Sequence, residues 1–262
     1  QFYLSFTATD LLTPADNPFV GVENYTFLLE GGEFREVLWI TAIYTVACVV
    51  LAISAGLGTA LLLNANFRGR GIARALVTVP WAAPSVAVAL IFTWMFNAQY
   101  GIFNHVLRWF GLAAGNENWL DSPALALPAI LLTTVWQIFP FSSVVILAAL
   151  QGVPQEVREA AVIDGAGRLD VFKTATWPTI QPTVMLLTLF VTIWSLRRFD
   201  LIWLMTQGGP IGSTNTLVIE LYRQGFVFRD LGTAAAVGMI GLSVALLVTV
   251  LYFWLTRRTE MA

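Results

Sequence analysis

The chain has 262 residues, of which 57% are apolar and 11% are charged, and its mean hydropathy is +0.73. A soluble globular domain carries about 25% charged residues, so too few charges remain here to cover a water-facing surface. The net charge of −2 is small, and nothing in the pattern suggests nucleic-acid binding. Several apolar runs exceed the roughly 18 residues that cross a bilayer core as a helix. The sequence therefore predicts an all-α, polytopic transmembrane helix bundle.

We expect five membrane spans in this chain, each bounded by charged, Gly or Pro residues. Their approximate ranges are 37–63, 75–97, 125–150, 179–205 and 232–256. The first residues, Gln1–Phe6, look like the last turns of an earlier helix, so we expect a sixth, N-terminal span to be missing or truncated. We predict that residues 1–262 form a single transmembrane domain.

Basic residues in the loops predict the orientation of the spans. The 64–74 loop, the 151–178 loop and the C-terminal tail are rich in Lys and Arg, whereas the acidic segment before the first span has Arg35 as its only basic residue. By the positive-inside rule, the two loops and the C-terminus are cytoplasmic. The N-terminal segment and the loops 98–124 and 206–231 are then external.

Residues with catalytic or metal-binding chemistry are scarce. The only histidine, His105, falls in a predicted external loop, and the only cysteine, Cys48, lies in an apolar run. The only lysine is Lys173, and no G-x-x-x-x-G-K-[ST] phosphate loop is present. We therefore expect no catalytic residues, no metal site and no cofactor in this chain.

The 151–178 loop has the pattern of a helix–turn–helix. Pro154 suits the first turn of a helix, where its missing N–H costs nothing. Glu156 is an acid early in the expected helix, where it favours helix formation, and Gly165 can end that helix in the left-handed conformation. Leu169 begins a second short apolar stretch. Such a compact element is able to transmit force to a cytoplasmic partner.

This loop resembles the EAA loop of the permease subunits of ATP-binding-cassette importers. Glu159-Ala160-Ala161, Asp164-Gly165-Ala166 and Trp177-Pro178 occupy the places of the family's Glu-Ala-Ala, Gly and Leu-Pro elements, with Trp177 replacing the usual Leu. In that family the loop forms a coupling helix that docks on the ATPase subunit. The resemblance implies the same role for about residues 155–170, and it implies that ATP is hydrolysed on a separate subunit.

Other stretches resemble the carbohydrate-uptake branch of that family, in particular the maltose-type first permease. These stretches are Phe19–Tyr25, Trp136–Phe141 and Phe199–Pro210, which reads FDLIWLMTQGGP. The resemblance implies a bacterial inner-membrane protein that carries a sugar or sugar-like polar solute. It also implies three kinds of partner, namely a different second permease, two cytoplasmic ATPase subunits and an extracytoplasmic solute-binding protein.

Two adjacent arginines, Arg197 and Arg198, fall in the outer half of the predicted fourth span. A charge at membrane depth is expensive and faces protein or a water-filled cavity. One of the pair could line the translocation path and hydrogen-bond solute oxygens, and the neighbouring Asp200 is a further candidate for this path. Alternatively, the pair is structural, through an ion pair with Asp200 or with the second permease, or reaches the outer interface by snorkelling.

Five further polar or aromatic residues are candidates for the solute path. Trp194 and Trp203 could stack on the apolar face of a sugar, as could Phe199 and Tyr222, although aromatic residues near a bilayer interface also serve as belt residues. Gln137 lies inside an apolar span, where its amide needs a partner, and it either joins helices or contacts solute.

An ion-coupled secondary transporter that works without an ATPase is the alternative function. Such proteins show internal repeats and broken helices at the membrane midplane. Neither feature is evident in this sequence.

Overall fold

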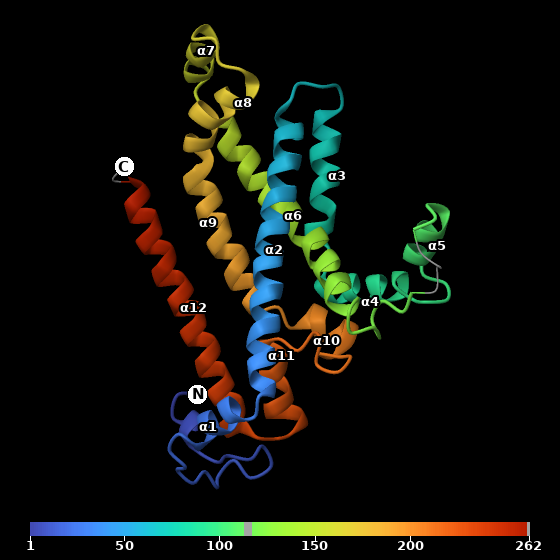
Figure 1. Ribbon diagram of the computed structural model, residues 1–262, viewed down its shortest axis with the longest axis vertical. Helices are drawn as coiled ribbons and strands as arrows, with labels where there is room; N and C mark the ends of the chain where they lie inside the picture. The colour runs from blue at the N-terminus through green and yellow to red at the C-terminus, as the bar shows by residue number, and fades with distance from the viewer. Residues whose placement is uncertain (113–116, 261–262) are drawn as a thin grey trace. The chain divides into compact units, whose positions relative to one another are not determined.

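The computed structural model describes residues 1–112 and 117–260 (Figure 1), and these form helices apart from turns, loops and two isolated β-bridges. The elements in chain order are η1 (Leu4–Phe6), α1 (Glu23–Glu30), α2 (Glu33–Asn64), α3 (Arg70–Ala82), α4 (Ser85–Met95), α5 (Ile102–Trp109), α6 (Ala126–Gln151), α7 (Gln155–Ile163), α8 (Arg168–Val171), η2 (Phe172–Thr176), α9 (Trp177–Leu196), α10 (Asp200–Thr206), α11 (Leu217–Tyr222), η3 (Arg223–Val227) and α12 (Leu231–Glu260). The all-α prediction is confirmed.

Four helical stretches of the described chain are long and apolar enough to cross a membrane, and a bent pair of helices raises the number to five. The four are α2, α6, the continuous helical stretch from α8 through α9, and α12. In the most apolar 18-residue stretch of α6, 56% is buried, whereas the corresponding share in α12 is 22%. Most side chains of α12 are therefore left to contact lipid or another chain. Residues Leu4–Phe6 form one 3-10 turn, and the expected span ahead of them stays a prediction.

The predicted 75–97 span is not one continuous helix. It is broken between α3 and α4, where the chain bends by 93°. Ala83 and Pro84 are both extended at the break, with ψ angles of 135° and 132°. Proline has no N–H to continue the helix and disfavours the helical conformation of the residue before it. The predicted second span is therefore a bent pair of helices, and the count of five spans holds when this pair is taken as one.

The predicted 179–205 span is also interrupted. Helix α9 ends at Leu196, and helix α10 starts anew at Asp200, which puts an acidic side chain in its first turn. That position is favourable because the N-terminus of a helix carries partial positive charge. Arg197 and Arg198 thus lie in the connection between two helices and not within a span.

The chain divides into two compact units, each assembled from three stretches. One unit contains residues 1–47, 84–133 and 193–250. The other begins with residues 48–83 and 134–192 and continues from Leu251. Helices α2, α6, α9 and α12 contribute residues to both units, whereas α7 and α8 belong to the second alone.

The second unit has a core built from α2, α6 and α9. Its buried side chains include Ala60 of α2, Ile146 and Leu150 of α6, and Ile180 and Leu187 of α9. The helices α2 and α6 approach closely, because a Cβ on Gly56 would lie 2.6 Å from the Cβ of Ser142. Small residues allow such close helix packing in membranes.

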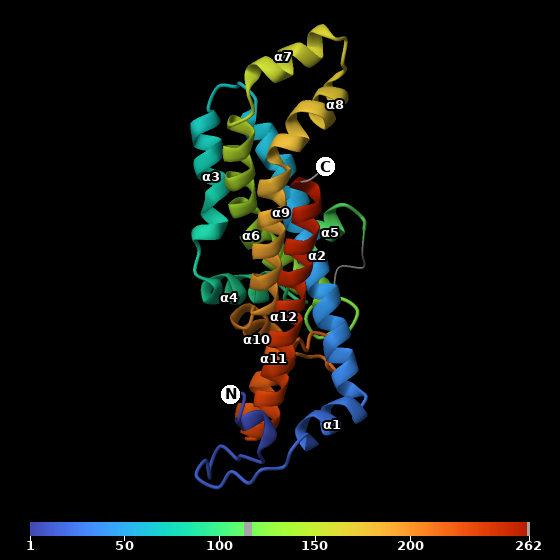
Figure 2. The ribbon, with the colours of Figure 1, turned by 90° about the vertical axis from the view of Figure 1, so that its left-hand side faces the viewer.

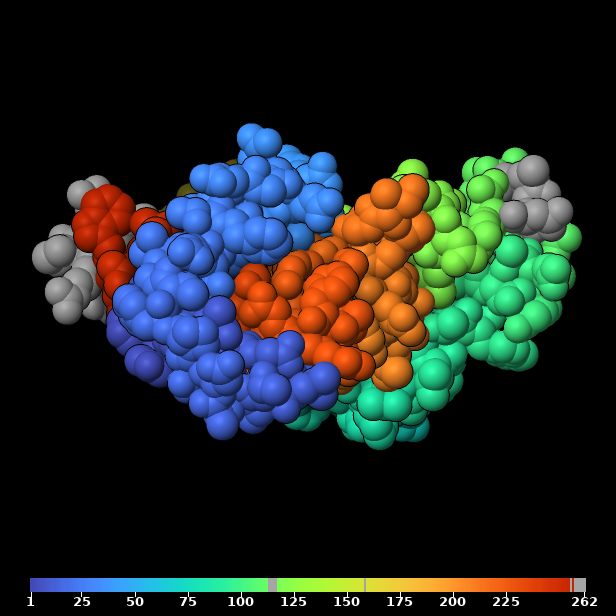
Figure 3. Space-filling model, turned by 90° about the horizontal axis from the view of Figure 1, so that it is seen from below, coloured from blue at the N-terminus to red at the C-terminus, as the bar shows by residue number. Residues whose placement is uncertain are grey.

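The first unit joins the start of α2 to α1, α11 and α12. Phe34, Leu217 and Val237 are buried in its core, and the hydroxyl of Thr41 in α2 accepts a hydrogen bond of 2.9 Å from the backbone N–H of Leu217 at the start of α11. Figure 3 shows the N-terminal segment, in blue, beside the orange helix α11.

The residue Asn24 connects this N-terminal segment to the rest of the first unit. Its buried side-chain amide donates to the carbonyls of Ser5 and Thr7, at 3.0 and 2.9 Å. Nearby, a Cβ on Gly232 would lie 2.0 Å from the Thr7 carbonyl oxygen, so only glycine fits there. Asn24 belongs to the Phe19–Tyr25 motif, and the structure gives the motif a role in fastening this segment over the start of α12.

Candidate functional sites

Helix α7 and helix α8 form the helix–turn–helix that the sequence predicts for the 151–178 loop (Figure 2). Pro154 precedes α7 with an extended backbone, and Glu156 lies in the first turn. Helix α8 leads through the π-helical turn η2 directly into α9. Helix α8 is therefore continuous with a candidate membrane span, and α7 joins it through the turn at Gly165.

Gly165 ends α7 with a φ of +84°, which confirms the predicted left-handed conformation. The N–H of Gly165 donates to the carbonyl of Val162, and the N–H of Ala166 donates to the carbonyl of Ala161, both at 3.0 Å. These two bonds define a Schellman motif, in which a residue of positive φ satisfies the last carbonyls of a helix. A Cβ at Gly165 would meet no atom within 4 Å, so only the backbone angle selects glycine here.

The surface of α7 and α8 combines charge with uncovered apolar side chains. Glu159 is exposed, and its carboxylate accepts a 2.6 Å hydrogen bond from the amide of Gln155. Ile163 and Leu169, on either side of the Gly165 turn, are 84% and 73% exposed. The sequence pattern did not single out these two residues as a contact surface, because an apolar residue in a short helix is ordinarily assigned to that protein's own core.

Gln137 of α6 is buried and supports the break between α3 and α4. Its amide nitrogen donates to the carbonyl of Ala83 at 3.0 Å. That carbonyl lies just past the end of α3, where the extended backbone of Ala83 and Pro84 interrupts the helical hydrogen-bond pattern. The structure therefore supports the interpretation that Gln137 joins helices, and it assigns the side chain a specific partner.

The residues Arg197, Arg198 and Asp200 lie at the break between α9 and α10. Arg197 is exposed and Arg198 is half-buried. The carboxylate of Asp200 accepts a hydrogen bond from the hydroxyl of Ser85 at the start of α4, so this acid ties α10 to α4. The two arginines remain candidates for contact with a solute.

An aromatic cluster brings α10 and α11 together. The ring of Tyr222 lies 4.8 Å from that of Phe199, 4.5 Å from that of Trp203 and 5.0 Å from that of Phe226. Phe199 and Trp203 are themselves stacked at 5.7 Å. We call these four residues the aromatic cluster. Its members are only partly covered by protein, and Phe226 is 56% exposed.

The structure separates the candidates that sequence reasoning had grouped. Trp203 belongs to the aromatic cluster, whereas Trp194 lies on α9, one turn before the break, and is 38% exposed. Phe226 was not predicted as a member. Its spacing of four residues from Tyr222 was the signal that could have found it, because residues i and i+4 share a helix face.

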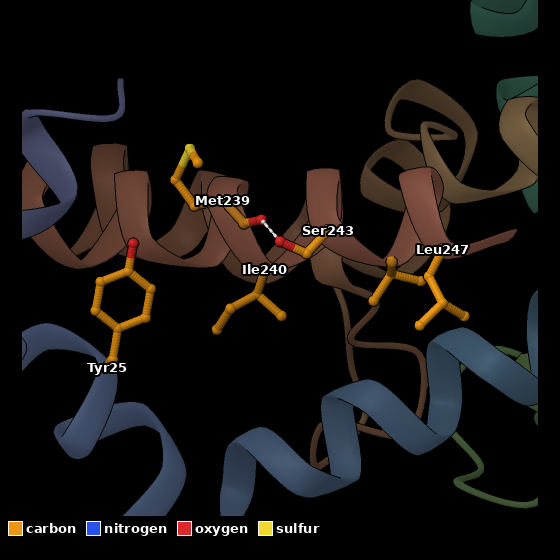
Figure 4. Close-up of a pocket in the computed structure, with 6 residues that line it drawn as sticks. Tyr25, Met239, Ile240, Ser243 and Leu247 are labelled. Carbon is orange, nitrogen blue, oxygen red and sulfur yellow. Dashed lines mark hydrogen bonds between the residues drawn. The ribbon is translucent and has the colours of Figure 1, made fainter. Parts of the chain in front are cut away.

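A groove of about 340 Å³ on the first unit is lined mainly by apolar side chains (Figure 4). Tyr25 of α1 and a row of α12 residues that includes Met239, Ile240 and Leu247 line it. Its serine, Ser243, donates its hydroxyl to the Met239 carbonyl of the same helix at 2.9 Å. The groove offers little polar chemistry to a sugar. Nor does any group of three or more His, Cys, Asp or Glu side chains in residues 1–112 and 117–260 suit a metal ion.

Comparison with known proteins identifies close relatives over most of the chain. The sequence is 36% identical over 258 residues to the sulfoquinovosyl glycerol transport system permease protein SmoG of Agrobacterium fabrum, a match that covers 98% of this chain and 83% of that protein. It is also 36% identical over 242 residues to the trehalose/maltose transport system permease protein MalF of Thermococcus litoralis, covering 92% of this chain and 81% of that one.

Solved structures share the fold. A chain of a bacterial alginate ABC transporter, crystallised in complex with an alginate pentasaccharide-bound periplasmic protein, matches with a TM-score of 0.81 at 23% identity, over 91% of this chain and 83% of that chain. Residues 37–261 match the family described as the binding-protein-dependent transport system inner membrane component. The chain therefore belongs to this family of membrane-spanning ABC importer permeases.

Proposed function

We propose that this chain, paired with a different second permease, forms the translocation path for a sugar or sugar-like polar solute and receives its driving force through α7. The observation that carries the proposal is the α7–α8 element, which presents Glu159, Ile163 and Leu169 around a fixed turn at Gly165. These three side chains are exposed, and other residues of their unit leave them largely uncovered. An ATPase subunit is the partner that such a surface would meet.

An importer driven by ATP hydrolysis needs a separate ATPase subunit here, because the given sequence has no phosphate-binding loop. On the predicted cytoplasmic side, the connection between α2 and α3 is short, whereas α7 and α8 form an ordered element that continues into α9. We infer that each of two ATPase subunits docks on one permease. Closure of the ATPase pair would then switch the permeases between inward-open and outward-open states, a rigid-body transition.

The aromatic cluster supports a sugar as the solute. Ligand sites combine aromatic surface with a few polar groups, and here Arg197 and Arg198 directly precede Phe199 of the cluster. The relatives named for sulfoquinovosyl glycerol and for trehalose and maltose agree with this class of solute. An extracytoplasmic solute-binding protein would deliver the solute. The rival function, an ion-coupled transporter without an ATPase, does not explain the exposed α7–α8 surface.

Two substitutions in α7 and its cap test the proposal. We expect Gly165→Val and Glu159→Lys to lower both uptake and solute-stimulated ATP hydrolysis, with weaker retention of the ATPase during purification. Any non-glycine residue at φ +84° costs roughly 1 kcal/mol or more, and a β-branched residue costs more. The charge reversal alters the surface offered to the ATPase. Solute binding to the separate binding protein should be unchanged.

The control is Gly167→Val, in the same exposed turn. Gly167 has a φ of −71° and a ψ of 169°, a backbone conformation open to valine, and a Cβ there would lie 3.3 Å from the carboxylate of the exposed Asp170 side chain. The measurement is ATPase activity of the reconstituted complex with and without loaded binding protein. Wild-type stimulation in both test variants would show that α7 is not the coupling element. Failure of any ATPase to copurify with the wild-type chain would instead favour the ion-coupled alternative.

A further inference from the structure

The loop of residues 207–216, between α10 and α11, presents an isoleucine in an unusual way. Ile211 is 93% exposed, the largest exposed fraction among the large apolar side chains in the described ranges. Its φ is +50°. A β-branched residue is a genuine outlier in this region, and such strain persists only where the surrounding structure enforces it. Neither burial nor backbone preference explains an isoleucine at this position.

Hydrogen bonds within the loop hold Ile211 in place. On either side of it, the N–H of Ser213 donates to the carbonyl of Pro210 at 3.0 Å, and the hydroxyl of Thr214 donates to the carbonyl of Gly209 at 2.8 Å. That hydroxyl also lies 2.7 Å from the hydroxyl of Thr206, at the end of α10. These bonds hold the loop in one conformation and keep the Ile211 side chain exposed. Binding a partner would therefore cost little conformational entropy in the loop.

The composition and place of the loop indicate the partner. Residues 207–216 contain no charged side chain, and the centres of protein interfaces are depleted in charge. The loop joins the two helices that carry the aromatic cluster, with Trp203 on α10 and Tyr222 on α11. Because the proposed function places solute at this cluster, a protein that releases solute there would contact the adjoining loop.

We propose that Ile211 is an anchor for the loaded solute-binding protein, inserting into an apolar recess beside that protein's solute cleft. The inference rests on the proposed function and adds a named contact to it. A buried apolar anchor of this kind carries a large share of the binding energy of an interface, while its neighbours contribute little. The bilayer and the second permease are the other surfaces that could cover Ile211.

The test compares Ile211→Asn with Ile211→Leu in the complete complex in lipid nanodiscs. Asparagine tolerates positive φ, so the loop should keep its shape while losing the apolar contact. We expect Ile211→Asn to raise the concentration of solute-loaded binding protein that gives half-maximal ATPase stimulation about tenfold. Ile211→Leu should stay within about threefold of wild type, because it keeps the apolar bulk. The control Leu12→Asn removes another exposed apolar side chain of the same unit and should match wild type.

A fluorescent reporter separates the possible occupants. An environment-sensitive dye on Ile211→Cys should shift to the blue only when loaded binding protein is added; the native Cys48 is buried and supplies the background. A shift already complete in nanodiscs without binding protein would assign Ile211 to lipid or the second permease and overturn the inference. So would wild-type stimulation of Ile211→Asn. If no binding protein stimulates the wild-type complex, the proposed function fails and the inference fails with it.

Discussion

Arg197 and Arg198 lie in the connection between α9 and α10. Single substitutions can test the role of each one. Arg197 is exposed and follows the last residue of α9, whereas Arg198 is half-buried. We expect Arg197→Ala to lower uptake about tenfold, because a hydrogen bond to a charged group contributes roughly 1.5 to 3 kcal/mol. Arg198→Ala should also impair uptake, and both variants should still assemble with their partners.

Uptake of labelled solute and copurification of the subunits measure these two effects independently. Arg197→Lys retains the charge but not the planar donor pair, and should fall between Ala and wild type. Arg35→Ala, an exposed arginine of the same unit, serves as the control. Normal transport by both alanine variants would remove the pair from the solute path. Loss of assembly in either one would assign that arginine a structural role.

At the scale of the element, the approach of α2 to α6 depends on Gly56. We expect Gly56→Ala to destabilise the permease by about 1 to 3 kcal/mol, the usual cost of overpacking, because the new Cβ would collide with Ser142. The matched control is Gly58→Ala on the same helix, where a Cβ meets nothing within 4 Å. Alanine favours helix over glycine, so this control should keep or raise the thermal midpoint.

Thermal unfolding of the two variants in the same detergent gives the comparison. An equal midpoint for Gly56→Ala and wild type would show that α2 and α6 can separate without cost. The break between α3 and α4 is a second feature at this scale, because the Gln137 side chain satisfies the Ala83 carbonyl at the break. Helix interruptions at membrane depth are tolerated where neighbouring side chains satisfy the freed backbone groups.

For the molecule as a whole, the orientation in the membrane is a prediction that the structure makes easier to test. Arg168 and His105 are both exposed, so cysteines placed there are accessible to a membrane-impermeant maleimide. We expect His105→Cys to react from outside and Arg168→Cys only after the membrane is permeabilised, since the basic 151–178 loop is predicted to be cytoplasmic. Asn24 is buried and unsuitable as a reporter, although it is predicted to be external.

Labelling of intact cells, followed by a mass-shift assay, decides between the two orientations. External reaction of Arg168→Cys would contradict the orientation and the coupling role of α7 together. Reaction of both cysteines from outside would contradict the arrangement of the spans between them. Residue Lys173 offers a second site in the same loop, at the π-helical turn.

Much of the architecture follows from local sequence patterns. Long apolar runs predict α2, α6 and α12 because a bilayer selects for length and hydropathy alone. The Pro154 and Gly165 signals predict the bounds of α7, and the positive φ of Gly165 is confirmed. These features depend on backbone conformation and solvent, which act on neighbouring residues. The motif resemblance likewise predicted the permease family, and comparison with relatives confirmed it.

Only the tertiary structure decided which distant groups meet. The sequence indicates that Gln137 needs a partner, but the Ala83 carbonyl lies 54 positions away along the chain. Likewise, Phe199 and Tyr222 form one cluster because α10 and α11 pack together. Such contacts depend on the packing of separate helices, whereas periodicity and hydropathy describe each helix by itself.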